Sequence, residues 1–365
     1  MDVIFNKITL IEVSITLVLF YIFPKASILI YGIPILLYFF YNNQKKQSKL
    51  VTNNHMNAAL YSYSDLHSYK SIKIPKFGPE EVLVQVKGAS INPIDKIQTT
   101  KIPFLRWWFP WTIGRDVAGI IVDIGANVRK FQIGEQVYGK AVGGSLQEYT
   151  NCNQDQIAHK PNNTSFVEAA SLGLAGLTSL QSLNWFRNLN SNDKVLIIGA
   201  SGGCGSLAVQ IAKSYGAKVY GVCSQKNIKF VKELGCDVII DYTNPNFLID
   251  IQDVSFDLIY DTVTSADDAD QEKIFGSNLS NTGYYVATNT GDMLNFARSM
   301  IRLEKSHYHL HMLKWNTADL DTLRELVESN KLKPLGCETY HLNDINVAFD
   351  KLKSRRTVGK IAFEI

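Results

Sequence analysis

The feature that most constrains the fold is a glycine-rich turn that joins a buried strand to a helix. Residues 194–198 (KVLII) form an apolar run, residues 199–205 (GASGGCG) follow at once, and a helix is predicted over 204–215. Glycines let the backbone of such a turn approach a pyrophosphate, and the helix N-terminus adds free N–H groups and a positive dipole. The turn therefore predicts a dinucleotide site. Its expected contact residues are Ser201, Gly202, Gly203 and Cys204.

Strands and helices continue to alternate after this turn. Further strands are predicted at 218–223, 237–240, 256–261 and 283–287. Alternation of this kind produces βαβ units and a parallel, doubly wound sheet. We therefore expect an α/β fold in which residues 179–316 form a Rossmann domain.

The residues on either side of this stretch predict a second, β-rich domain. A chain of 365 residues suggests about two domains. Short strands between glycine turns are predicted at 81–87, 116–124 and 135–139, and the chain closes with two amphipathic helices and a strand at 359–364. We expect residues 56–178 to form this domain and residues 317–365 to return to it.

The end of the second Rossmann strand indicates which nicotinamide cofactor binds. NAD enzymes usually place an acid there to hold the ribose 2′-hydroxyl, but residues 222–227 (VCSQKN) contain no carboxylate. Ser224 can donate a hydrogen bond to the 2′-phosphate of NADPH, and Lys226 supplies positive charge. Tyr242, after the third strand, is expected beside the adenine ribose. The predicted cofactor is NADPH.

Charge and cysteine spacing argue against two classes of site. The net charge is only +3, so no global field points to nucleic acid. The five cysteines are far apart and no pair has C-x-x-C spacing, which predicts neither a disulfide framework nor a zinc site. The histidine run at 307–311 (HYHLH) is expected to be an ordinary strand. We expect no metal and a reducing compartment.

The start of the chain is unusually apolar. Only Glu12 and Lys25 interrupt the apolar character of residues 8–41, which is long enough for a membrane helix. Residues 1–45 are therefore predicted to be a membrane anchor, either one span kinked at Pro24 or a short hairpin that turns there. Residues 46–55 read as a polar linker.

Basic residues after the apolar run predict its orientation. Lys45, Lys46 and Lys49 favour the cytoplasmic side of a membrane. We expect the enzyme domain in the cytosol, on the endoplasmic reticulum or the mitochondrial outer membrane. A mitochondrial location is the alternative, although the first forty residues contain no Arg and make a poor transit peptide.

Several segments carry a resemblance to a known family. Besides the glycine turn they are GASINPID at 88–95, IGRDVA at 113–118, GGSLQEY at 143–149, EAASLGLAGLT at 168–178 and DVIIDY at 237–242. Over residues 56–365 the chain resembles the zinc-free quinone oxidoreductase branch of the medium-chain dehydrogenase/reductases, in its reticulon-4-interacting-protein-like group. The resemblance implies a GroES-like catalytic domain, split in sequence around the Rossmann domain, with NADPH in the cleft between them. It implies that Asn92 and Thr178 lie near the nicotinamide and that Lys360 approaches the cofactor.

The chain departs from its resembled family at one point. Several quinone reductases carry a tyrosine shortly after the Asn-Pro-x-Asp motif, but this chain has no tyrosine between Tyr69 and Tyr138. A tyrosine proton donor therefore cannot be carried over. The aromatic segment 104–111 (FLRWWFPW) is expected either to line an apolar substrate cleft or to pack in the core.

These features predict an enzyme that passes a hydride from NADPH to a quinone or an α,β-unsaturated carbonyl, independently of zinc. Asn92 is the candidate for orienting the nicotinamide or polarising the substrate oxygen. The alternative is a non-catalytic NADPH-binding adaptor at a membrane, because a fold alone does not establish activity. Expected partners are a small apolar carbonyl or quinone substrate and the membrane, and a homodimer is also considered.

Overall fold

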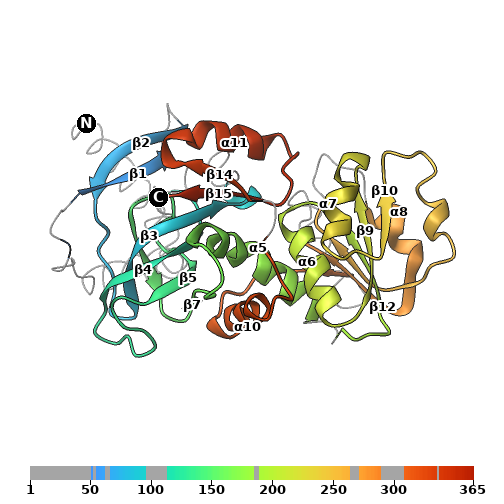
Figure 1. The fold of residues 1–365 in the computed structure, drawn as a ribbon, viewed down its shortest axis with the longest axis horizontal. Helices are drawn as coiled ribbons and strands as arrows, with labels where there is room; N and C mark the ends of the chain where they lie inside the picture. Colours follow the sequence, from blue (N-terminus) through green and yellow to red (C-terminus); the bar gives the residue numbers. More distant parts are fainter. Residues whose placement is uncertain are drawn as a thin grey trace, which may run out of the picture.

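Two lobes make up the part of the chain that the structure describes (Figure 1). The computed structural model describes Val51 and residues 55–61, 66–95, 113–184, 189–263, 271–288, 308–334 and 337–365. The predicted membrane segment at 8–41 and the aromatic segment at 104–111 lie outside these ranges. Among the helices inside them, none is both long enough and apolar enough to cross a bilayer.

The first lobe is built on a seven-stranded sheet in the order β14-β15-β3-β4-β5-β7, with β6 also paired to β3. Its strands are β3 (Glu81–Ile91), β4 (Asp116–Ile124), β5 (Gln136–Lys140), β6 (Tyr149–Asn153), β7 (Ile157–His159), β14 (Cys337–His341) and β15 (Lys360–Glu364). A hairpin of β1 (His55–Tyr61) and β2 (Leu66–Lys73) accompanies it. Helix α11 (Ile345–Lys353) packs Ile345, Ala348 and Phe349 into the core of this lobe.

The second lobe is a six-stranded parallel sheet in the order β10-β9-β8-β11-β12-β13. Its strands are β8 (Lys194–Ile198), β9 (Lys218–Cys223), β10 (Val238–Asp241), β11 (Phe256–Asp261), β12 (Leu279–Ala287) and β13 (Tyr308–Leu310). Its helices are α6 (Gly203–Ser214), α7 (Ile228–Glu233) and α8 (Gln271–Phe275). By sequence position the strand order is 3-2-1-4-5-6, the doubly wound arrangement that binds dinucleotides where the order reverses.

Helix α5 (Phe166–Asn184) lies between the two lobes (Figure 1). A capping box begins it, because Ser165 N and Oγ both donate to the Glu168 carboxylate and Glu168 N donates back to Ser165 Oγ. The expected domain boundary after Thr178 falls inside this continuous helix. The lobes therefore share α5 rather than meeting at a linker.

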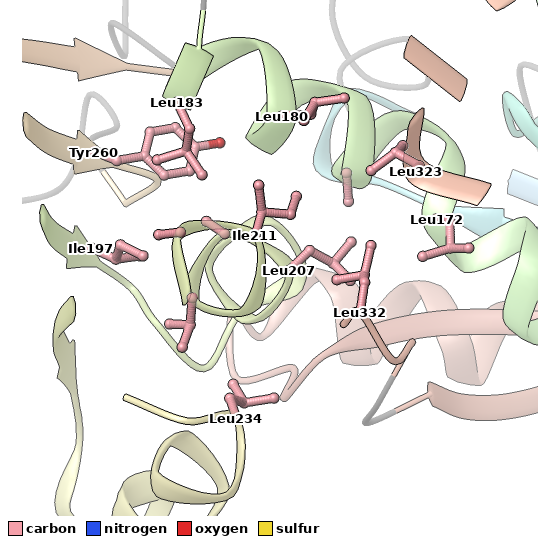
Figure 2. Packing of buried hydrophobic residues seen from close by; sticks show 14 of the residues in the cluster. Leu172, Leu180, Leu183, Ile197, Leu207, Ile211, Leu234, Tyr260, Leu323 and Leu332 are labelled. Atoms are coloured by element: carbon pink, nitrogen blue, oxygen red, sulfur yellow. The ribbon is translucent and has the colours of Figure 1, made fainter. Parts of the chain in front are cut away.

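The core around α5 shows why the helix is apolar on nearly every side. Figure 2 shows its leucines packed with Leu207 and Ile211 of α6 and with Tyr260 of β11. Leu323, from helix α10 (Thr317–Glu328), joins the same cluster. Full burial of each leucine contributes about 1.5–3 kcal/mol, so the helix is held firmly against both lobes.

The end of the chain returns to the first lobe. Helix α10 begins at an Asn316 cap, whose side chain accepts from Asp319 N at 2.8 Å. Strand β14 then pairs in parallel with β15, and β15 pairs antiparallel with β3. The last strand thus lies beside the strand that leads to Asn92.

Candidate cofactor and active site

The glycine turn follows β8 in the geometry that the sequence predicts. Gly199 has φ +81°, and a Cβ there would lie 2.6 Å from Thr262 Oγ1. A Cβ on Gly205 would lie 2.1 Å from the Gly199 carbonyl oxygen. Gly199 is required by its positive φ, and Gly205 by the close approach of α6 to the backbone of the turn.

The glycines between them are free for a different role. Gly202 is the N-cap of α6, and a Cβ there would meet nothing nearer than the Gly199 carbonyl oxygen at 3.4 Å. A Cβ on Gly203 would lie 2.9 Å from Cδ of Lys360. Gly202 therefore keeps the N-terminus of α6 open, while Gly203 leaves room for the Lys360 side chain.

The last strand of the first lobe touches this turn directly. Gly359 N donates to the Ser201 carbonyl oxygen at 2.9 Å, and Gly202 and Gly359 form an isolated parallel bridge. Cys204 follows at the start of α6, where burial raises the pKa of its thiol. The structure thus brings Ser201, Gly202, Gly203 and Cys204 together with Lys360.

A second group of predicted residues lies at the end of β9. Ser224 is buried, whereas Lys226 is exposed and Tyr242 keeps 56% of its surface exposed. Asn227 connects this group to the glycine turn, because its Nδ2 donates to Ser201 Oγ at 2.9 Å. The sequence reasoning did not single out Asn227, and only the contact across two loops reveals it.

The structure also brings a carboxylate to this place. Asp241 ends β10 in register with Cys223 of β9, and it accepts hydrogen bonds from Thr243 N and Oγ1. These bonds, with one from the backbone of Gln225, hold the pKa of Asp241 below its usual value. A carboxylate therefore lies at the end of the third strand, beside the end of the second strand, which lacks one. Its position at the end of a predicted strand was the signal that could have revealed it.

A buried polar cluster lies where β3, β4 and β15 meet α5. Asn92 Nδ2 donates to Asp116 Oδ2 at 2.8 Å, and Lys360 Nζ donates to Asn92 Oδ1 at 2.5 Å. Lys360 Nζ also lies 3.3 Å from Asp116 Oδ2. Asn92, Asp116 and Lys360 are 3%, 0% and 6% exposed. An ion pair and an amide are thus held together out of water beside the glycine turn.

Two further residues complete this region. Asp95 Oδ2 accepts from Asn92 N at 2.7 Å, which closes the turn after β3, and burial raises the pKa of Asp95 to about 7. Thr178 is buried on α5, and its hydroxyl donates to the Leu174 carbonyl oxygen at 2.7 Å. Thr178 therefore has only an acceptor lone pair left to offer a ligand.

Comparison with known proteins identifies the family of this chain. Residues 78–177 match the family described as alcohol dehydrogenase GroES-like domain, and residues 234–362 match the family described as zinc-binding dehydrogenase. The mitochondrial NAD(P)H oxidoreductase RTN4IP1 of Bos taurus is 30% identical over 327 residues, covering 79% of this chain and 82% of its own length. The 2-methylene-furan-3-one reductase of Solanum lycopersicum is 32% identical over 334 residues, covering 82% and 77%. The solved quinone oxidoreductase of Coxiella burnetii has a TM-score of 0.74 and 28% identity, covering 85% of this chain and 99% of its own.

One of these family descriptions names zinc, and the described residues do not fit that metal. Zinc sites need three or four sulfur, nitrogen or carboxylate ligands. Within the described ranges, no group of three His, Cys, Asp or Glu side chains is placed to hold a metal ion. In the polar cluster the Lys360 ammonium already neutralises the Asp116 carboxylate. The described residues therefore do not provide a zinc site.

The two domain matches, the relatives and the solved neighbour all agree with the two-lobed architecture. The alignments with relatives of at least 30% identity span most of each relative's length. The chain belongs to the medium-chain dehydrogenase/reductase family and is an oxidoreductase of its quinone oxidoreductase-like branch.

Proposed function

We propose that the protein uses NADPH to reduce a quinone or an α,β-unsaturated carbonyl, without zinc. The observation that carries this proposal is the contact between the glycine turn and the buried Asn92 cluster, made through Gly359 and Lys360. This contact puts a nucleotide-binding turn next to an amide that can hydrogen bond to a carbonyl oxygen. The names of the relatives support the substrate class, since they include quinone oxidoreductases and a 2-methylene-furan-3-one reductase.

The residues of this chain bind and orient, while the nicotinamide supplies the hydride when it is bound. The open N-terminus of α6 at Gly202 would receive the pyrophosphate. Ser224 and Lys226 would hold the 2′-phosphate. Asp241 opposes that preference, because its carboxylate lies at the end of the neighbouring strand. NADPH is therefore proposed as the preferred cofactor, with a preference moderated by Asp241.

Two exposed apolar side chains support an apolar substrate. Ile94 follows Asn92 after one residue and is 41% exposed. Val263 follows β11 and is 38% exposed, and its Cγ2 would lie 2.7 Å from a Cβ on Gly199. Both flank the elements that hold the proposed site. An apolar ring or chain would cover them and exclude water from the carbonyl group.

The test is NADPH oxidation by the full chain in detergent, with a panel of quinones and enones. Oxidation with either class, retained after exhaustive chelation, is the expected result. NADPH binding without oxidation by any of these acceptors would favour the non-catalytic adaptor and contradict the proposed function.

Membrane attachment through residues 8–41 is proposed on the sequence alone. The apolar length supports it. We further propose that residues 56–365 face the cytosol. Relatives carry mitochondrial and chloroplastic names, so a mitochondrial location is the alternative. Protease added to intact organelles should digest the enzyme domain, and protection would favour the alternative. The homodimer stays a prediction that sedimentation of the detergent-solubilised chain can test.

A further inference from the structure

The Asn92 side chain is hydrogen bonded on both sides, and these bonds fix which way its amide faces. Its Nδ2 donates to Asp116 Oδ2 at 2.8 Å and its Oδ1 accepts from Lys360 Nζ at 2.5 Å. An ammonium can only donate and a carboxylate can only accept. The reversed amide would place its oxygen against Asp116 and its NH2 group against Lys360. The two charged neighbours therefore exclude the reversed orientation.

The Lys360 ammonium contacts three protein acceptors. It donates to the Ile91 carbonyl oxygen at 3.2 Å, to Asn92 Oδ1 and to Asp116 Oδ2. Its side chain is only 7% exposed. An ammonium has three N–H donors, so this set accounts for all of them. In this arrangement Lys360 has no donor left for a phosphate or a carboxamide.

Asp116 is held just as firmly by other elements. Its Oδ2 accepts from Ser90 Oγ at 2.7 Å, and its Oδ1 accepts from Leu174 N of α5 at 2.7 Å. A Cβ on Gly173 would lie 2.7 Å from Asp116 Oδ1, so a glycine is needed where the carboxylate meets the helix. The carboxylate is thus fixed by β3, by α5 and by Lys360 of β15, and it does not follow Asn92 if the amide moves.

We propose that Asp116 and Lys360 are positioning residues that act through Asn92. They fix its amide so that the second N–H of Nδ2 is the group offered to a ligand, and that ligand is a carbonyl oxygen. This inference rests on the proposed function. The carbonyl belongs either to the substrate or to the carboxamide of the nicotinamide, which share this chemistry.

The size of the effect follows from the role of the donor. Removing one donor to a carbonyl oxygen that gains charge in the transition state costs on the order of 100-fold in turnover. Loss of Lys360 leaves the Asn92 amide held only by its donation to Asp116, so the amide is less firmly oriented and turnover is expected to fall roughly 10-fold. Once Asn92 has been replaced, the Lys360 substitution should then lower turnover no further.

The experiment is a double-mutant cycle on the full chain in detergent, with Asn92→Ala, Lys360→Met and the pair. Turnover should fall on the order of 100-fold in Asn92→Ala and roughly 10-fold in Lys360→Met, and the double variant should equal Asn92→Ala. Asp116→Asn should behave as Lys360→Met does. The matched control is Lys160→Met, which removes another buried lysine that donates to Pro161 and Thr164 carbonyl oxygens, and it should keep wild-type turnover.

A structural role for Lys360 gives a different pattern. It would lower turnover by the same factor whether or not Asn92 is present, and that additivity would overturn the proposal. The dissociation constant of NADPH identifies the carbonyl. If Asn92→Ala weakens NADPH binding by the same factor by which it lowers turnover, the ligand of Asn92 is the carboxamide of the nicotinamide. If NADPH binding is unchanged, the ligand is the carbonyl of the substrate.

Absence of wild-type turnover would refute the proposed function but still leave the orientation testable. The same four chains would then be unfolded in urea. If Lys360 holds the Asn92 amide, the effects of Asn92→Ala and Lys360→Met on the unfolding equilibrium constant should not be independent. The effect of the double variant should then differ from the product of the two single effects by on the order of 10-fold. Additive effects would show that the amide is not held by Lys360 and would end the proposal.

Discussion

Replacing two glycines of the same turn should separate cofactor binding from fold stability. Gly202 and Gly205 are three residues apart, yet their surroundings differ. A Cβ on Gly202 would have a single neighbour at 3.4 Å, whereas a Cβ on Gly205 would lie 2.1 Å from the Gly199 carbonyl oxygen and 2.8 Å from Ala200 Cα. Gly202→Ala is thus tolerated by the protein itself, and Gly205→Ala is not.

The magnitudes follow from these contacts. At the N-cap position Ala is worse than Gly by about 1 kcal/mol or less, and the reduced entropy of the unfolded chain returns about 0.4–1 kcal/mol. Gly202→Ala should therefore change the free energy of unfolding by less than about 0.5 kcal/mol. At Gly205, helix propensity alone would favour Ala by about 1 kcal/mol. The overlap with Gly199 outweighs this gain, so we expect a net loss of about 1–3 kcal/mol.

Cofactor binding should change in the opposite order. A methyl group on Gly202 projects into the open space at the start of α6, where the pyrophosphate is proposed to lie. We expect Gly202→Ala to weaken NADPH binding at least tenfold, or about 1.4 kcal/mol. Folded Gly205→Ala should bind within roughly threefold of the wild type, because its extra methyl faces the backbone of Gly199 and Ala200 rather than the ligand.

Urea unfolding followed by circular dichroism measures the first quantity, and NADPH fluorescence titration measures the second. Both use the full chain in detergent. Wild-type NADPH affinity in Gly202→Ala would refute the placement of the pyrophosphate at this helix end. Undiminished stability in Gly205→Ala would refute the packing argument.

Further predictions concern cofactor choice, pH, metal and membrane attachment. NADPH should bind at least tenfold tighter than NADH, about 1.4 kcal/mol, and Lys226→Asp should erase most of that preference; fluorescence titration with both cofactors measures it. Asp241→Asn should increase the preference roughly threefold, because it removes a charge near the 2′-phosphate. Burial raises the pKa of Asp95 to about 7, so the folded chain keeps a proton that the unfolded chain loses near pH 4. The wild type should therefore lose about 2 kcal/mol of stability relative to Asp95→Asn between about pH 5 and pH 7, and no more above that range; urea unfolding at a series of pH values tests this. Activity should survive exhaustive chelation, and stoichiometric zinc whose removal abolishes turnover would contradict the absence of a zinc role. The full chain should resist carbonate extraction, whereas release into the soluble fraction would count against the anchor at 8–41.

The elements of the Rossmann lobe were predictable because their signals are local. Strands 194–198, 218–223 and 256–261 were predicted with the bounds of β8, β9 and β11. Each is a short apolar run bounded by turn residues. Strand β14 was missed, because Cys337–His341 (CETYH) is mostly exposed at the edge of its sheet and shows no apolar run. Its pairing with β15 is visible only in the folded chain.

The candidate site likewise has one part that could be predicted from the sequence and one part that could not. The glycine turn is one continuous segment, so the pattern and spacing of its residues predicted it. The polar cluster joins Asn92, Asp116 and Lys360, and the bond between Asn92 and Lys360 closes a separation of 268 residues. No local pattern indicates that the lysine points to an amide rather than to a phosphate. Asp241 was within reach of sequence reasoning, since the third strand neighbours the second in a doubly wound sheet.

The most direct test of zinc-free hydride transfer follows deuterium from the cofactor to the product. The full chain, treated with a chelator, is mixed in detergent with an enone and NADPH carrying deuterium at the transferred C4 position. The product is then examined by mass spectrometry and NMR. We expect one deuterium at the β-carbon and an equal amount of NADP+. Cofactor oxidation without label at that carbon, or no reaction in a chain that binds both molecules, would contradict the proposed hydride transfer to enones.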